Sequence, residues 1–114
     1  MGKLTTHVLD TTHGCPAAGI AVRLYDGSGK LLREARTNAD GRCDAPLLEG
    51  EALRAGRYRL EFEVGAYFRA AGPPAPEPPF LDVVPVAFAV ADPDANYHVP
   101  LLVSPFGYGT YRGS

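Results

Sequence analysis

The strongest constraint on the fold is a strict alternation of apolar and charged residues in the middle of the chain. From Arg57 to Val64 the sequence reads RYRLEFEV, with an apolar side chain at every even position and a charge at every odd one. Successive side chains of an extended strand point to opposite faces, whereas a helix brings its apolar residues back every three or four positions. The period of two therefore predicts a β-strand with one solvent-facing side.

Several other segments carry strand and turn signals. Residues 19–25 end at the sequence DGSG of residues 26–29 and a further extended run follows, which predicts a β-hairpin. A second turn signal, NADG, precedes residues 42–45, which we predict to form a short strand closed by a proline. Residues 83–90 and 97–103 are further strand candidates.

Prolines and one short helix complete the predicted architecture. Pro85 and Pro100 lack an amide N–H, so we expect them at sheet edges or with the missing donor turned away from a partner strand. Residues 66–71, followed by Gly72, predict a helix of one or two turns. The proline-rich residues 73–79 predict an ordered extended connection over the surface. About seven or eight short strands with turns between them predict an all-β antiparallel sandwich.

Size and charge limit the number of domains and the kinds of partner. A chain of 114 residues with 46% hydrophobic residues predicts one globular domain over residues 1–114. The net charge is -2 and no stretch gathers four lysines or arginines, so we expect no nucleic-acid or membrane partner. The first ten residues lack the apolar core of a signal peptide, and no run approaches a membrane span. These features predict a cytoplasmic protein.

The three histidines are candidate acid–base groups because imidazole titrates near neutral pH. His13 lies in a predicted turn, where a solvent-exposed loop residue is the ordinary interpretation. His7 and His98 lie in extended segments, and His98 shares a strand face with Pro100 and Leu102. A histidine on a strand can be structural or catalytic, and the pattern leaves both roles open for these two residues.

The cysteines, the motifs for metal sites and serine triads, and the arginines give weaker indications of a functional site than the histidines. Cys15 and Cys43 form no CxxC pair, which predicts two reduced thiols. The chain has neither an HExxH motif nor a GxSxG motif, so we expect no metal, no other cofactor and no serine triad. Arg42 follows a turn glycine and Arg112 lies near the chain end, positions from which a guanidinium can reach an oxygen-rich ligand.

Five segments together resemble one known family. They are LTTHVLD at residues 4–10, GR at 41–42, PFLDVVPV at 79–86, YHVPLLVSP at 97–105 and the terminal YRGS at 111–114. In this combination the chain resembles the transthyretin-related 5-hydroxyisourate hydrolases, enzymes of urate breakdown, over essentially its whole length. The YRGS ending is the most discriminating of these marks, because transthyretin itself, a hormone carrier of the same fold, does not end this way.

The resemblance implies a fold, an assembly and a reaction. The fold would be an eight-stranded transthyretin-like sandwich, assembled as a homotetramer (a dimer of dimers) with active sites in a channel between the dimers. The reaction would convert 5-hydroxyisourate and water to 2-oxo-4-hydroxy-4-carboxy-5-ureidoimidazoline by general acid–base catalysis without a cofactor. The residues that the resemblance implies are His7, Arg42 and His98 for catalysis, with His7, Arg42, Tyr111, Arg112 and Ser114 binding the substrate.

Departures from the family pattern and alternative functions also follow from the sequence. Asn96 stands where the family often has a histidine, and Gly109 where it often has a serine, but neither position is assigned to catalysis. A transthyretin-type carrier of a small aromatic ligand is the alternative function, and a purely structural adhesion domain is a third. A carrier has no use for paired bases, and the absence of a secretion signal argues against an adhesion domain. Which histidine is the general base is left open.

Overall fold

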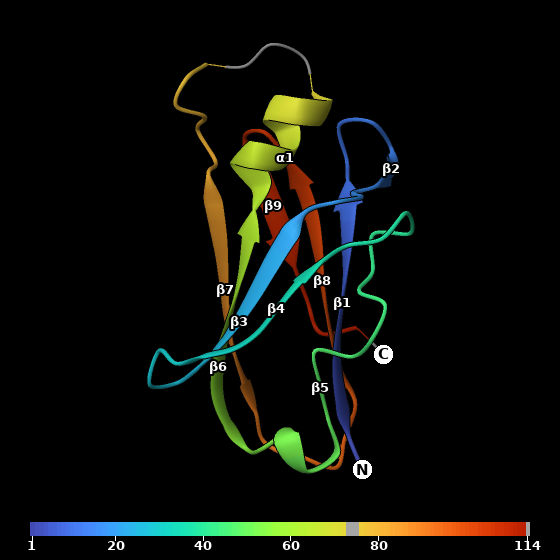
Figure 1. Ribbon diagram of the computed structural model, residues 1–114, viewed down its shortest axis with the longest axis vertical. Coiled ribbons are helices and arrows are strands. Elements are labelled where there is room, and N and C mark those ends of the chain that lie inside the picture. The colour runs from blue at the N-terminus through green and yellow to red at the C-terminus, as the bar shows by residue number, and fades with distance from the viewer. Residues whose placement is uncertain (73–75, 114) are drawn as a thin grey trace.

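Two β-sheets packed face to face form the body of the protein in this computed structural model, which describes residues 1–72 and 76–113 (Figure 1). The predicted sandwich is confirmed, with nine strands, one α-helix and one 3-10 turn in the described ranges. The elements are β1 (Lys3–Asp10), β2 (Cys15–Pro16), β3 (Ala21–Asp26), β4 (Leu31–Arg36), β5 (Leu48–Glu49), η1 (Gly50–Ala52), β6 (Gly56–Glu63), α1 (Val64–Ala71), β7 (Val83–Val90), β8 (Tyr97–Ser104) and β9 (Gly107–Thr110).

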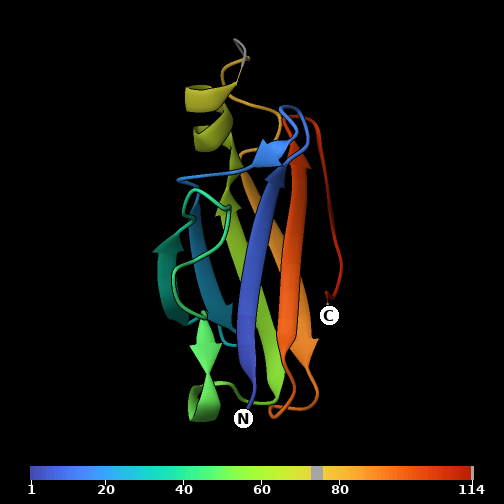
Figure 2. The same ribbon diagram turned by 90° about the vertical axis from the view of Figure 1, so that its right-hand side faces the viewer.

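Each sheet follows a simple order. One sheet runs β2-β1-β8-β9 with β5 also paired to β1, and the other runs β4-β3-β6-β7. The described strand pairs are antiparallel apart from β1 and β8, which run parallel with Thr5 opposite His98 and His7 opposite Pro100. Figure 2 shows these two strands side by side and pointing the same way. The sandwich therefore joins the two ends of the chain within one sheet.

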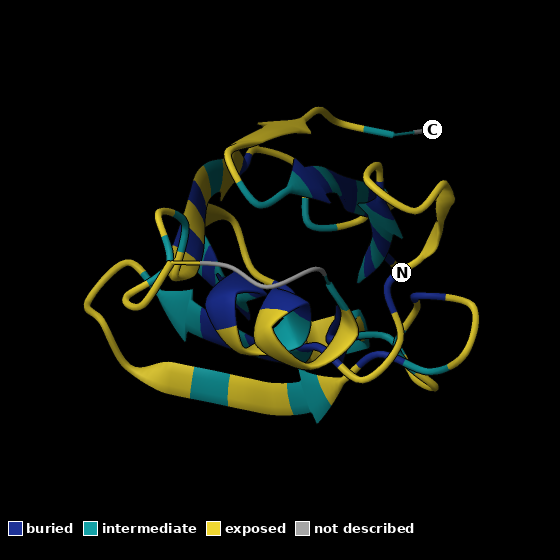
Figure 3. Cartoon of the chain, turned by 90° about the horizontal axis from the view of Figure 1, so that it is seen from above, coloured by how far each residue is buried: buried dark blue, intermediate teal, exposed yellow. Residues whose placement is uncertain are grey.

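The apolar faces of the two sheets make one core. The alternation of β6 is confirmed, because Leu60 and Phe62 are fully buried while Arg59, Glu61 and Glu63, which alternate with them, are not. Leu4 and Val8 of β1 are also fully buried in the same core. Each such side chain contributes about 1.5–3 kcal/mol on burial. Figure 3 shows the buried segments toward the interior and the exposed C-terminal segment outside them.

The helix is fastened to the end of β1 by a buried carboxylate. α1 starts two residues earlier than predicted and ends at Gly72 as predicted. The hydroxyl of Tyr67 donates to Oδ2 of Asp10 at 2.7 Å, and the side chain of Asp10 is fully buried. Nδ1 of His13 donates to the same oxygen at 2.6 Å. The helix end and the turn after β1 thus share one acceptor.

Hydrogen bonding decides the charge of this carboxylate. Burial alone raises the pKa of Asp10, but the hydrogen bonds from His13 and Tyr67 outweigh burial and hold that pKa below its ordinary value. Burial and the bond to Asp10 raise the pKa of Tyr67. His13 lies in an exposed turn, as predicted, but its ring is also a structural donor.

The predicted strand at residues 42–45 is wrong. Only Arg42 makes a bridge, with His7, and the next paired residues are Leu48 and Glu49. The side chain of Asn38 explains the difference, because its carbonyl oxygen accepts from the amides of Asp40 and Arg42. These local bonds hold the chain in a closed loop and compete with strand pairing.

The prolines occupy two kinds of strand position. Pro85 lies in β7, at the edge of its sheet, as expected. Pro100 lies in the inner strand β8, but the pairing with β9 reaches only Leu101, so no β9 partner faces Pro100.

Part of the predicted connection, residues 73–75, lies outside the described residues. The described part of the chain contains no helix that is long and apolar enough to cross a membrane.

We expect Tyr67→Phe to lower the free energy of unfolding by about 1.5–3 kcal/mol, the range for a hydrogen bond to a charged group. The substitution removes one donor from the buried Asp10 carboxylate and keeps the aromatic ring. Urea denaturation near neutral pH measures the change. The matched control is Tyr25→Phe, because the ring of Tyr25 lies against the guanidinium of Arg59 on the other sheet, away from Asp10. Equal stability of the Tyr67→Phe variant and the wild-type protein would contradict this role.

Candidate active site

The candidate site lies on the outer face of the sheet that contains β1 and β8. Leu4, Thr6 and Val8 of β1 point into the core, so the residues between them face outward. His7 is one of these outward residues. His98 lies between the buried residues Tyr97 and Val99 of β8 and faces the same way as His7. The parallel register brings the two histidines to neighbouring positions on one face.

The turn before Arg42 brings this residue against β1. Gly41 has a φ of 76°, and a Cβ atom there would overlap the carbonyl oxygen of Val8. The amide of Val8 donates to the carbonyl oxygen of Gly41 at 2.8 Å, and Arg42 bridges His7. Only a glycine allows this close approach, so Gly41 places Arg42 beside His7.

A hydrogen bond determines which nitrogen of His7 carries the proton. Nε2 lies 2.9 Å from the carbonyl oxygen of Asp40. A carbonyl oxygen only accepts, so Nε2 carries the hydrogen and donates to Asp40. In the neutral ring, Nδ1 of His7 is then the nitrogen with the free lone pair, which is the form that a general base requires.

His98 is held from both sides of its strand. Nδ1 of its ring lies 2.9 Å from Oγ1 of Thr5 on β1. On the other side, the amide of Gly113 donates to the carbonyl oxygen of His98 at 2.7 Å. A Cβ atom at Gly113 would lie 2.6 Å from Cδ2 of the imidazole, so the glycine leaves space for the ring.

The surroundings of His98 favour the neutral imidazole. Burial lowers the pKa of His98, and the positive charges of Arg42 and His7 lower it further. His98 is therefore neutral near neutral pH, although two basic groups lie close to it.

A hollow of about 420 Å³ opens beside these residues. Its wall includes Thr5, Arg42 and His98, whereas His7 is not among the described residues that line it. Cys43 also lines it, and burial raises the pKa of this thiol, which disfavours the nucleophilic thiolate. Cys15 and Cys43 form no disulfide with each other in this structure. Within the described ranges, no three histidine, cysteine, aspartate or glutamate side chains group as metal ligands.

The C-terminal residues occupy a neighbouring position. The guanidinium of Arg112 stacks over the ring of Tyr97, 4.1 Å from its centroid, and donates to the carbonyl oxygen of Asn96 at 3.2 Å. Tyr111 is 59% exposed, and with Arg112 it lines a separate hollow of about 350 Å³. The single chain thus brings His7, Arg42 and His98 together but directs Arg112 elsewhere. Ser114 lies outside the described residues.

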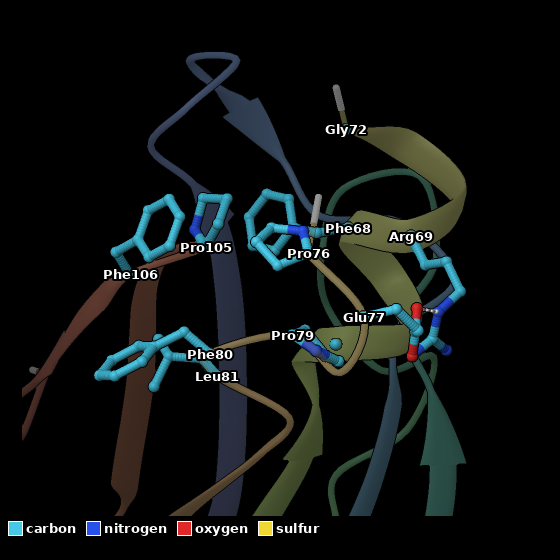
Figure 4. A pocket seen from close by; sticks show the side chains of 11 residues that line it. Phe68, Arg69, Gly72, Pro76, Glu77, Pro79, Phe80, Leu81, Pro105 and Phe106 are labelled. Carbon is cyan, nitrogen blue, oxygen red and sulfur yellow. Dashed lines mark hydrogen bonds and ion pairs between the residues drawn. The ribbon is translucent and has the colours of Figure 1, made fainter. Parts of the chain in front are cut away.

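An apolar hollow at the end of the sandwich that carries α1 contains none of the residues predicted for the site (Figure 4). It has a volume of about 350 Å³ and lies between α1 and the turn after β8. The rings of Phe80 and Phe106 lie 6.2 Å apart at its side and are largely exposed. Arg69 and Glu77 form an ion pair at 2.9 Å across its other wall.

The sequence analysis missed two residues of the site, Thr5 and Gly113. Thr5 has the same alternation as His7, so its outward position could have been predicted. Its contact with His98 could not, because that contact depends on the register of two strands that are 93 residues apart. Gly113 was noticed only as part of the YRGS ending.

Comparisons with known proteins agree with this architecture. The model of the HIUase/Transthyretin family matches residues 4–113. A 5-hydroxyisourate hydrolase of Ralstonia nicotianae is 60% identical over 117 residues, which cover 100% of both chains. The structure of Klebsiella pneumoniae 5-hydroxyisourate hydrolase has a TM-score of 0.84 and 38% identity, with 100% of both chains covered.

A larger protein contains a similar unit. The crystal structure of (S)-allantoin synthase superposes with a TM-score of 0.94 at 44% identity. The match covers 99% of this chain but only 44% of that protein, so this chain spans less than half of its length. The family model and the full-length match to the Ralstonia protein show that the chain belongs to the HIUase/Transthyretin family.

Proposed function

We propose that this protein hydrolyses 5-hydroxyisourate, giving 2-oxo-4-hydroxy-4-carboxy-5-ureidoimidazoline. The observation that carries the proposal is the meeting of His7, Arg42 and His98 on one sheet face from three separate segments. Relatives that carry the name of this hydrolase support the choice of substrate. The residues supply the groups that hydrolysis of an acyl–nitrogen bond requires.

The reaction needs a proton to leave water and a proton to reach the ring nitrogen. The water oxygen forms a bond to the carbonyl carbon while Nδ1 of His7 accepts the proton of the water. The bond between that carbon and the ring nitrogen then breaks, and His7 returns the proton to the leaving nitrogen. No proton is gained or lost in total. General acid–base catalysis of this kind contributes about 10²–10⁴-fold to the rate.

The reaction also needs groups that stabilise negative charge on the carbonyl oxygen and groups that bind the substrate. Arg42 stabilises the negative charge that grows on the carbonyl oxygen during attack. His98 is uncharged and contacts the reacting ring. Tyr111, Arg112 and Ser114 bind the substrate and enclose it. In the single chain Arg112 stacks on Tyr97, so this part of the proposal requires the C-terminal segment to meet the site in the assembled protein.

We also propose a homotetramer built as a dimer of dimers, with the sites in a channel between the dimers. The outer face that carries His7 and His98 is open in one chain, and a second layer is needed to exclude water from it. The strands β7 and β9 are edges of their sheets and can pair with another copy. Exposed aromatic side chains on and beside these edges, Phe106, Tyr108 and Tyr111, support burial by a partner.

We expect His7→Asn and His98→Asn each to slow turnover by about 10²–10⁴-fold, because each removes an imidazole from the reacting groups. Uricase generates 5-hydroxyisourate from urate in the cuvette, and its ultraviolet decay is followed with and without protein. His13→Asn is the control for loss of a histidine outside the site. Normal turnover by a folded His7→Asn or His98→Asn protein would contradict the mechanism. Binding by the wild-type protein without faster decay would instead identify a carrier.

We expect Arg42→Gln to raise the pKa of His98, because a nearby positive charge is removed while burial remains. The sign follows from the charge of the imidazolium, which Arg42 repels. The acid limb of kcat/KM should move to higher pH with it, since His98 acts in its neutral form. An NMR titration of the His98 ring measures the shift, and Arg57→Gln, on the other sheet, is the control. An unchanged or lower pKa in Arg42→Gln would contradict the electrostatic account.

Sedimentation velocity tests the assembly. We expect a species with four chains at assay concentrations and a loss of activity per chain when dilution separates the dimers. The channel between the dimers is lost at that point, while each sandwich keeps its own core. Full activity of a monomeric species would refute the proposal that the site needs a partner.

A further inference from the structure

The hydroxyl of Thr5 contacts the imidazole of His98 across the two strands. The two residues are opposite each other in the parallel register, and Oγ1 lies 2.9 Å from Nδ1. Among the residues that the structure describes, Oγ1 of Thr5 has no other hydrogen-bond partner. Thr5 therefore touches the catalytic ring at the nitrogen that lies against the sheet, and it does so from a rigid strand.

We propose that Thr5 is a positioning residue: its hydroxyl donates to Nδ1 of His98, so that Nε2 carries the hydrogen and presents an N–H to the substrate. This inference rests on the proposed function, since it assigns the form in which His98 takes part in that reaction. Thr5 lines the same hollow as Arg42 and His98, and in this inference it acts through His98.

The proposed direction of the hydrogen bond rests on the partners of the Thr5 hydroxyl. A hydroxyl can donate or accept, and among the described residues Nδ1 of His98 is the one hydrogen-bond partner of Oγ1, so we assign the hydroxyl hydrogen to this bond. Burial and the nearby charge of Arg42 lower the pKa of His98 and so disfavour a second proton on its ring, which leaves a neutral tautomer. When Nδ1 accepts, the hydrogen of the neutral imidazole must reside on Nε2.

The backbone fixes the ring on its other side. The Cα of Gly113 approaches so closely that an added Cβ would lie 2.6 Å from Cδ2 of His98. The amide of Gly113 holds the strand itself through the carbonyl oxygen of His98. Thr5 and Gly113 together restrict both the rotation of the imidazole and the choice of its tautomer.

The two histidines then present different atoms to the reaction. The carbonyl oxygen of Asp40 forces the hydrogen of His7 onto Nε2, which leaves a lone pair on Nδ1. Thr5 leaves an N–H on Nε2 of His98. His7 takes the proton from water and returns it to the leaving nitrogen, whereas His98 keeps its proton and donates a hydrogen bond to the substrate. A neutral imidazole suits this role because its N–H polarises a carbonyl without losing the proton.

Nitrogen NMR of the histidine rings tests the tautomer directly and needs no substrate. In ¹⁵N-histidine-labelled wild-type protein at neutral pH, we expect a pyridine-type shift for Nδ1 of His98 and a pyrrole-type shift for Nε2. Thr5→Val removes the hydroxyl with little change in shape and should convert these to averaged shifts of mixed tautomers. Thr5→Ser keeps a hydroxyl and should restore the wild-type pattern.

Kinetics tests the consequence for the reaction. We expect Thr5→Val to lower kcat by roughly five- to tenfold, the loss typical of one hydrogen bond, with a smaller change in KM. Thr5→Ser should keep most of the activity. The matched control is Thr11→Val, which removes a hydroxyl that donates to the carbonyl oxygen of Val103 at 3.1 Å, away from His98. Thr11→Val should retain wild-type kcat and wild-type shifts for His98.

Two results would overturn the inference. One is a wild-type His98 whose Nδ1 has the pyrrole-type shift, and the other is a folded Thr5→Val protein with unchanged shifts and unchanged kcat. Failure of the wild-type protein to hydrolyse 5-hydroxyisourate would refute the proposed function instead, and the NMR comparison would still decide whether Thr5 sets the tautomer.

Discussion

The parallel pairing of β1 with β8 is the interaction on which the rest of the structure depends. It joins strands from opposite ends of the chain. One face of this strand pair is part of the core, and the other face carries the candidate site. On the buried face, Thr6 donates to the carbonyl oxygen of Val99 at 2.7 Å, and the neighbouring apolar residues fill the core. On the outer face the same register sets Thr5 against His98 and places His7 beside them. A shift of one residue would exchange the two faces, so the core and the site are specified together.

Electrostatics gives this outer face its chemical character. Two imidazoles and a guanidinium share a small region, and such a cluster cannot carry all of its charges at low cost. The pKa of His98 is lowered by burial and by the positive charge of Arg42 beside it. The result is an uncharged histidine next to a permanent cation. Backbone and hydroxyl groups then decide which nitrogen of each ring holds the hydrogen.

Local sequence patterns predicted the elements well and their partners poorly. The alternation from Arg57 to Val64 identified a strand because it reflects burial on one side, and Gly72 marked the helix end. The strand predicted at residues 42–45 failed because the side chain of Asn38 closes the loop with local bonds that a pattern of residue types does not reveal. The parallel partner of β1 and the contact of Thr5 were also beyond reach, since both depend on a register set by the whole core. Arg42, His7 and His98 were named as candidates through the family resemblance, and their roles stay predictions. The fold brings these residues near one another through the β1–β8 register and the bridge between His7 and Arg42.

The central claim is that His7 and His98 act as one unit on a single reacting ring. A double-variant cycle with His7→Asn and His98→Asn tests it most directly, because losses from groups that act together do not multiply. The account predicts that the double variant is no more than slightly slower than the slower single variant. If the two losses multiply in full while the proteins remain folded and assembled, the histidines act independently and the account is wrong.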